Sequence, residues 1–244
     1  YEGIPIFATV RQAQEKVRLD LNSAREIYNY KLKEIENVIS FTSIRDAIRN
    51  DLAQKNLEML NSRLGEVRKK ARLDILTITD GTGRVVFRSS NPGIAGDSQA
   101  NDELVSRVLA EKKVFASTEI VSQDELRKEG EELASRARIK LIYTPKARPR
   151  QEDEETAGMM LKAAAPIFDL ANNFIGVAYG GVLLNRNFEI VDKTKQTVFQ
   201  DLKYKGEDIG TATLFQDDLR IATNVRNRDG SRAIGTRIAE DVYQ

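Results

Sequence analysis

Two cationic side chains lie in sequence contexts where they could bind an anion. Arg88 ends the apolar stretch RVVFR and precedes the loop SSNPGIAGDS, whose glycines would let backbone N–H groups approach a negative charge. Lys162 lies among apolar residues in MMLKAAAPIF, where an ammonium group is costly to bury unless it is paired. The alternatives are an exposed arginine at a strand end and a structural salt bridge of the lysine. The chemistry that both cations share is recognition of a carboxylate.

Small and polar residues accompany these cations, as expected around a small-molecule cavity. Three alanines at 163 to 165 follow Lys162, and the stretch FIGVAYGGVLL contains Gly176, Gly180 and Gly181. Small side chains leave room either for a second backbone or for a ligand on the face of a sheet. We therefore predict the following ligand-binding residues: Arg88, Ser89, Asn91, Asp97, Lys162, Ala164 and Tyr179.

The composition removes several classes of catalytic and metal site. The 244 residues include no histidine and no cysteine, which excludes Ser-His-Asp and Cys-His nucleophile systems and most zinc sites. An enzyme would need a pair of carboxylates in a cleft, and no spacing indicates one. The net charge of +1 favours no nucleic acid partner. We therefore predict no catalytic residue, no metal and no cofactor.

The first seventy residues are predicted to be mostly helical. Apolar residues recur at steps of three and four from Leu21 to Ile39, and neither Gly nor Pro occurs between Thr9 and Asn37. An average globular helix has only about 11 to 12 residues. We expect a stalk-like helix over residues 4 to 40 that lies along the rest of the chain. The alternative is an ordinary core helix that breaks near Thr42.

The middle of the chain alternates strand and helix patterns. Residues 71 to 121 are predicted as strand, turn, strand, loop, helix and strand, and residues 159 to 185 as two apolar strands joined by the polar turn DLANN. Between them, residues 123 to 140 are predicted as one charged helix. Residues 144 to 158, TPKARPRQEDEETAG, are predicted as a mobile exposed loop, with a lid over a ligand as the alternative.

The end of the chain repeats an earlier pattern. In residues 73 to 98, and again in residues 208 to 237, an apolar strand, a polar turn and a second strand are followed by a Gly-containing loop. This repetition predicts two related modules in tandem. The expected fold class is α+β, with a long N-terminal helix, an antiparallel-sheet module and a second, truncated module.

Three stretches resemble the double Cache sensor domains, which fuse Cache 3 and Cache 2 modules of PAS-like fold in bacterial transmembrane receptors. They are TDGTGRVVFRSSNPGIAGDSQAND, LKAAAPIFDLANNFIGVAYGGVLLN and GTATLFQDDLRIATNVRNRDGSRAIGT. The resemblance implies a helical signalling region at residues 1 to 70, a membrane-distal module at 71 to 200 and the start of a membrane-proximal module at 201 to 244. In the family the second module continues with further strands, so an incomplete second module is expected here.

The same resemblance implies a function outside the cytoplasm. Members are periplasmic ligand-sensing domains of inner-membrane histidine kinases or chemoreceptors. The sensing domains themselves catalyse no reaction. For this chain we expect a carboxylate-like small-molecule ligand, a membrane-anchored parent protein and a homodimer through the apolar stripe of the long helix. The alternatives are a structural or interaction domain of a cell-surface assembly and, less favoured, a periplasmic enzyme.

Overall fold

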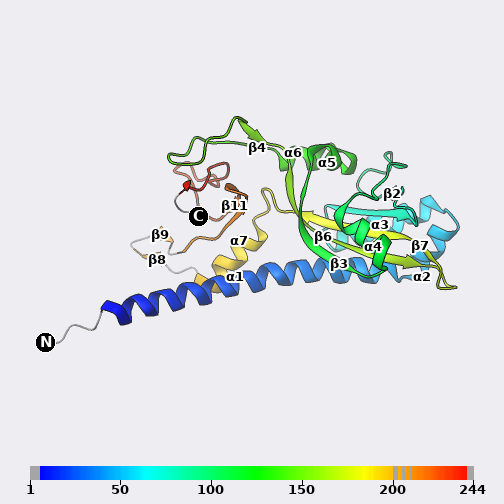
Figure 1. Ribbon diagram of the computed structural model, residues 1–244, viewed down its shortest axis with the longest axis horizontal. Helices are drawn as coiled ribbons and strands as arrows, with labels where there is room; N and C mark the ends of the chain where they lie inside the picture. The colour runs from blue at the N-terminus through cyan, green and yellow to red at the C-terminus, as the bar shows by residue number, and fades with distance from the viewer. Residues whose placement is uncertain (1–5, 200–202, 205–206, 209, 241–244) are drawn as a thin grey trace.

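One long helix runs along most of the length of the molecule (Figure 1). The computed structural model describes residues 6–199, 203–204, 207–208 and 210–240. Helix α1 spans Ile6–Ser43, which confirms the predicted long helix, although residues 4 and 5 of that prediction lie outside the described residues. Because α1 contacts the central strands of the main sheet and also helix α7 near the second hairpin, the stalk prediction is confirmed.

Two shorter helices follow α1 at the far end of the molecule. They are α2, Asp46–Ala53, and α3, Leu57–Lys70. The helix ends at Ser43, close to the break near Thr42 that the alternative of an ordinary core helix included. The side chain of Asn56 begins α3 by accepting a hydrogen bond from the Met59 N–H.

An antiparallel sheet of five strands forms the centre of the first module, which confirms the α+β fold class. The strand order is β2-β1-β7-β6-β3. The strands are β1, Ile75–Asp80; β2, Val85–Arg88; β3, Phe115–Val121; β6, Gly158–Phe168; and β7, Phe174–Leu183. Both long strands, β6 and β7, are buried over most of their length, as expected for a sheet covered on both faces.

The two faces of the sheet carry separate apolar clusters. On one face, Ile35 and Ile39 of α1 pack in the cluster that contains Ala163 and Ala165. On the other face, Ala164 packs in a cluster with α4, Glu103–Glu111, and α5, Gln123–Glu129. This alternation follows from the opposite directions of successive side chains in a strand. The sheet therefore has a helix layer on each side.

The glycines of β7 allow close packing and do not form the floor of a cavity. A Cβ atom on Gly176 would lie 2.1 Å from the Thr79 carbonyl oxygen, and one on Gly181 would lie 2.4 Å from the Leu161 carbonyl oxygen. A Cβ atom on Gly180 would lie 2.6 Å from Ile39 Cδ1 of α1. Of the two explanations for these small residues, the close approach of another part of the chain is therefore the correct one.

The predicted single helix over residues 123 to 140 is two helices and a short strand. Helix α5 ends at Glu129, Gly130 interrupts the helix, α6 spans Glu131–Ala137, and β4 covers Ile139–Lys140. Strand β4 pairs with β5, Glu154–Glu155. The missing side chain of Gly130 weakens a helix interior, which explains where the helix is interrupted.

The predicted mobile loop is instead attached to the C-terminal part of the chain. We call residues 138–153 the strap. The Ile142 N–H donates to the Gly235 carbonyl at 2.8 Å, and the Glu240 N–H donates to the Lys146 carbonyl at 2.9 Å. The Leu141 N–H and the Asp153 carbonyl join the two ends of the strap at 2.8 Å. None of residues 144–153 is buried, so the predicted exposure is confirmed there, while mobility and the ligand lid stay predictions.

The repeated sequence pattern corresponds to a repeated hydrogen-bond pattern. After the β1–β2 hairpin, the Gly96 N–H donates to Val85 and the Val85 N–H donates to Asp97. After the second hairpin, the Gly235 N–H donates to Arg220 and the Arg220 N–H donates to Thr236. The prediction of two related units is thus supported at the level of the backbone.

The second hairpin consists of β10, Thr213–Gln216, and β11, Leu219–Thr223. Before it come α7, Glu189–Thr194, the π-helical turn η1, Lys195–Phe199, and the short strands β8, Lys203–Tyr204, and β9, Glu207–Asp208. The domain boundaries at residues 70 and 200 stay a prediction, and part of the segment 201–244 lies outside the described residues. No helix in the described ranges has both the length and the apolar character that crossing a bilayer requires.

The close packing of β7 leads to a stability prediction. Gly176→Ala should destabilise the fold by about 1 to 3 kcal/mol, because its Cβ atom would overlap a backbone oxygen that cannot easily move. The control is Gly65→Ala in α3, where the added methyl group meets nothing within 4 Å and should stabilise the helix by up to about 1 kcal/mol. Urea denaturation measures both. Equal effects of the two substitutions would contradict the proposed packing of β7.

Candidate functional site

A cavity of about 380 Å³ lies over the face of the sheet that α4 and α5 cover. This volume is within the range of small-molecule sites. The cavity is enclosed by the start of α4, by α5 and by edge strand β3. Its lining comprises Ile75, Gln99, Asn101, Asp102, Glu103, Thr118, Glu119, Ile120, Val121, Ser122, Glu125, Leu126, Glu129, Met160, Lys162 and Tyr179.

Lys162 lines the cavity but is already paired with two carboxylates. Its Nζ lies 2.7 Å from Glu119 Oε2 and also contacts Asp102, which in turn caps α4 by accepting the Val105 N–H. Burial acts to lower the pKa of Lys162, but the two neighbouring carboxylates outweigh this and raise it. Burial raises the pKa of Glu119 in spite of Lys162. The structural salt bridge is therefore present at Lys162.

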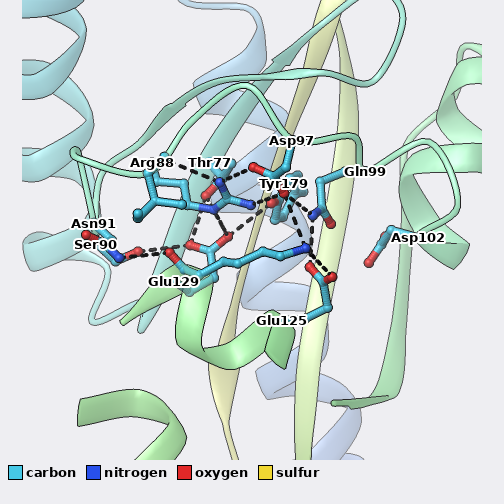
Figure 2. A network of polar contacts seen from close by, with 12 residues as sticks. Thr77, Arg88, Ser90, Asn91, Asp97, Gln99, Asp102, Glu125, Glu129 and Tyr179 are labelled. Atoms are coloured by element: carbon cyan, nitrogen blue, oxygen red, sulfur yellow. Dashed lines mark hydrogen bonds and ion pairs between the residues drawn. The ribbon is translucent and has the colours of Figure 1, made fainter. Parts of the chain in front are cut away.

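Arg88 is fully buried and makes a bidentate pair. Its two terminal nitrogens donate to Asp97 at 2.7 and 2.9 Å, and its Nε donates to Glu129 Oε1 at 3.0 Å (Figure 2). Burial acts to lower the pKa of Arg88, but the hydrogen bonds to Asp97 and the nearby charges raise it above its ordinary value. The same pair lowers the pKa of Asp97. The alternative of an exposed arginine at a strand end is wrong.

Glu129 is the common acceptor of the buried network. In addition to Arg88, it accepts hydrogen bonds from the hydroxyl groups of Thr77, Ser90 and Tyr179, at distances between 2.9 and 3.1 Å. Figure 2 shows these side chains converging on the carboxylate of Glu129 in α5. They come from strands β1, β2 and β7 and from the loop after β2. Four donors from different segments therefore fix α5 against the sheet.

The remaining contacts of α5 extend this network to the cavity. The Asn91 side chain donates to the Lys128 carbonyl at 3.0 Å. The Gln99 amide donates to Asp97 at 3.0 Å and to Glu125 at 2.9 Å (Figure 2). Asn91 and Gln99 thus attach α5 to the loop that also holds Asp97.

The predicted site residues occupy different places in this arrangement. Lys162 and Tyr179 line the cavity, whereas Arg88, Asp97 and Asn91 lie behind its wall and hold α5. Two of the predicted residues lie apart from the cavity: Ala164 is buried in the cluster below α4 and α5, and Ser89 is a buried hydroxyl whose Oγ has no hydrogen-bond partner in the described part of the chain. Their roles in ligand binding stay a prediction.

Sequence reasoning missed Glu129, although one signal was available. Leu126, Glu129 and Leu133 are spaced by three and four residues, so they would share one face of the single helix that the sequence predicts, and all three are buried in the structure. An acidic residue between two buried leucines indicates a buried carboxylate that needs donors. The cavity residues Gln99, Asp102, Glu119 and Glu125 were also missed, because they come from a loop, a helix cap, an edge strand and a charged helix.

The cavity is strongly acidic. Its lining contains five carboxylates and one ammonium group: Asp102, Glu103, Glu119, Glu125 and Glu129 against Lys162. The carboxylate of Glu129 is neutralised by the buried Arg88 behind it. A surplus of negative charge faces the cavity even so, which favours a positively charged group over an anion.

Comparisons with known proteins agree with the fold. Residues 182–244 match the family model described as single cache domain 3. The periplasmic domain of Vibrio cholerae LuxQ has 11% identity and a TM-score of 0.54, covering 88% of this chain and 82% of that one. The sensor domain of the V. cholerae histidine kinase DctB has 10% identity and a TM-score of 0.53, covering 89% and 69%.

A third structure extends this set. A domain of a putative sensory box/GGDEF family protein from Vibrio parahaemolyticus has 14% identity and a TM-score of 0.50, covering 91% of this chain and 74% of that one. No curated protein sequence matches the chain. At these identities the likeness shows the fold, and the prediction of a Cache-like sensor fold is confirmed.

The buried arginine leads to a prediction about folding. Arg88→Lys keeps the charge but loses the two-pronged contact with Asp97 and the contact with Glu129, so the free energy of unfolding should fall by about 3 kcal/mol. Arg127→Lys on α5 is the matched control, because Arg127 is exposed and its ion pairs are long, and it should change stability little. If Arg88→Lys is as stable as the control, the network does not support the fold.

A second prediction concerns pH. The pKa of Asp97 is lowered in the folded state, so its contribution to stability is complete above about pH 4, the ordinary pKa of aspartate, and is lost as the pH falls below that value. Asp97→Asn should therefore be clearly destabilising at pH 7 and progressively less so toward pH 3. Urea denaturation at several pH values measures the difference. A constant difference across this range would contradict the ionised pair.

Proposed function

We propose that this chain is the extracytoplasmic ligand-sensing domain of a bacterial transmembrane receptor, and that the cavity beside α5 is its ligand site. The observation that carries the proposal is a cavity of small-molecule size whose wall, α5, is held by polar contacts in addition to apolar packing. Polar contacts of this kind can be rearranged by a ligand. A ligand that prefers one position of α5 would shift the equilibrium between the two arrangements.

The fold supports the cellular setting of this proposal. The chain shares its fold with the periplasmic domain of LuxQ and the sensor domain of DctB. We propose from this likeness that the chain lies in the periplasm as part of a parent protein of the inner membrane, with a histidine kinase or a chemoreceptor as the output. A structural domain of a cell-surface assembly could have the same fold. Its function would not require a polar cavity whose wall, α5, is held by polar contacts.

The carboxylates of the cavity are proposed to serve electrostatics rather than acid–base catalysis. Asp102 and Glu119 both contact the same ammonium group, that of Lys162, and therefore take part in one salt-bridge cluster. A general acid and a general base need different environments that separate their pKa values. We therefore propose no catalytic role for the domain, and the enzyme alternative stays the less favoured one.

The ligand that we propose carries a positive charge. The predicted carboxylate-like ligand was based on two free cations, but Arg88 and Lys162 both have carboxylate partners in the structure. An anion would have to displace one of these carboxylates and would enter against the surplus negative charge. An ammonium group would instead meet Glu103 at the wall, and Glu125 where it could share the carboxylate that Lys128 contacts at 2.6 Å, with Met160 and the ring of Tyr179 beside its apolar part. A small organic amine fits these features.

A matched pair of probes tests the charge of the ligand. Butylamine and butyrate differ mainly in their charged group, and diamines and dicarboxylates extend the series. A probe at 100 times its dissociation constant should stabilise the fold by about 2.7 kcal/mol, which thermal unfolding detects. We expect stabilisation by amines that is reduced in Glu125→Gln, whereas Glu111→Gln, outside the cavity, should behave as the unchanged chain. Stabilisation by carboxylates alone would support the original prediction and refute the proposed cation.

The long helix is proposed to form a homodimer, but through a different face from the predicted one. The apolar stripe from Leu21 to Ile39 packs mainly on the chain itself, since Ile35 and Ile39 are buried in the core. Leu19, Tyr30 and Phe41 are instead 61%, 70% and 64% exposed. They are spaced by eleven residues, which is close to three helical turns, so they lie on one face of α1.

Single cysteines test the proposed dimer in a chain that has none of its own. Cysteines at Leu19, Tyr30 and Phe41 should cross-link in the membrane-anchored parent protein. Cysteines at the control positions Arg18, Asn29 and Ser40 have the same spacing but are rotated by about 100° around the helix, and they should cross-link poorly. Equal cross-linking at both sets would contradict a dimer through this face.

A further inference from the structure

We propose that the state of the cavity is passed to the second hairpin through α5, α6 and the strap, in addition to any path through α1. The proposal rests on the proposed function in one respect, since it takes the cavity as the site whose state is read. The route begins at α5, which supplies Glu125, Leu126 and Glu129 to the lining. Any change in the cavity that moves α5 also moves α6, because only Gly130 separates the two helices.

The end of α6 is connected to the second hairpin through one buried amide. The Asn185 Nδ2 donates to the Ala137 carbonyl, the last residue of α6, at 2.9 Å, and it also lies 3.4 Å from Gln216 Oε1 in β10. The Asn185 Oδ1 accepts the Met159 N–H of β6 at 2.8 Å. Asn185 is fully buried, so this amide cannot exchange its partners for water without local opening.

The backbone beside Asn185 makes a second connection. The Arg186 side chain donates to the Arg138 carbonyl at 2.9 Å, and the Arg186 N–H donates to the Ile221 carbonyl of β11 at 2.9 Å. The start of the strap and the second hairpin are therefore both bound to the same short segment. A displacement at the end of α6 acts directly on residues that hold β10 and β11.

The strap holds the other side of the hairpin through Arg237. The Arg237 guanidinium donates to Asp218 at 2.9 Å and to the Arg148 carbonyl of the strap at 2.7 Å, and the Arg237 N–H donates to Thr144 Oγ1 at 3.0 Å. Asp218, which lies in the turn of the hairpin, is 1% exposed. Because this carboxylate is buried, the ion pair has a strong preference for one geometry, and movement of the strap is transmitted to the turn.

Helix α1 contacts a different wall of the cavity. The Tyr28 hydroxyl of α1 and Thr118 Oγ1 of β3 lie 2.6 Å apart, and Thr118 lines the cavity on the side opposite the network of Glu129. The core residues of α1 pack on the other face of the sheet from α5. The two walls of the cavity therefore begin different sets of contacts, which meet where Ile139 of the strap packs in the same apolar cluster as Ile39 of α1 and Ile221 of β11.

Hydrogen exchange on the 244-residue chain tests the route without any ligand. Glu129→Gln replaces the acceptor of Arg88 with an amide and should release α5 from the sheet. We expect the amides of residues 213–223 and 235–237 to exchange at least about threefold faster. In a background where Thr144→Ala and Arg237→Gln have cut the strap contacts, adding Glu129→Gln should give a smaller further acceleration there, because the connections through Asn185 and Arg186 remain. Gln99→Ala removes the hydrogen bond from Gln99 to Glu125 of α5, which is a milder change. It replaces Glu129→Gln in the experiment if that variant does not fold.

Ile48→Ala in α2 is the control for loss of global stability, because Ile48 is fully buried and lies on the α1 side of the sheet. The proposal is overturned if Glu129→Gln and Gln99→Ala accelerate exchange only in α5 and β2, if Ile48→Ala at matched global stability gives the same pattern, or if the acceleration is undiminished after the strap is cut. A failure of the ligand proposal is distinguishable, since it would show in the probe titrations and leave these exchange rates unaffected.

Discussion

The fully buried guanidinium of Arg88 is the constraint on which the arrangement of the first module depends. A buried charge is stable only when it is paired and hydrogen-bonded, so the chain must bring acceptors to the end of β2. Asp97 supplies a bidentate partner from the loop that follows β2, and Glu129 supplies a second from α5. Satisfying one side chain thereby fixes both the loop and the helix that form the wall of the cavity.

The same requirement at Lys162 determines the charge of the cavity. Lys162 engages Glu119 on β3 and Asp102 at the start of α4, so its ammonium group holds an edge strand and a helix cap together. With both cations engaged in this way, the carboxylates at the lining still outnumber the cations beside them, although Lys128 pairs with Glu125 at 2.6 Å. The proposed ligand class therefore rests on the structural role of the cations, whose pairs disfavour a simple anion.

The elements of regular structure could be predicted from the sequence, while the polar network could not. The long helix, the two hairpins and the β6–β7 pair follow from local periodicity and turn residues, which depend on neighbours in the sequence. Arg88 and Lys162 were recognised as unusual, but their partners are distant in the sequence. Glu129 lies 41 residues from Arg88, and Asp102 lies 60 residues from Lys162. Such pairing depends on tertiary structure. The attachment of the strap to the C-terminal part of the chain was not predicted for the same reason. Its polar composition is that of a solvated loop, and the contacts with Arg237 depend on tertiary structure.

Nuclear magnetic resonance of the isotope-labelled chain, titrated with the amine that most raises the melting temperature, tests the central claim most directly. If the ligand binds in the cavity that α5 closes, the largest backbone amide shifts will fall between Glu119 and Glu129. A second cavity of about 380 Å³, which is mainly apolar, lies between α1, α7 and β10 and includes Leu21, Tyr28 and Leu214. Shifts concentrated around those residues, with α5 unaffected, would contradict the account.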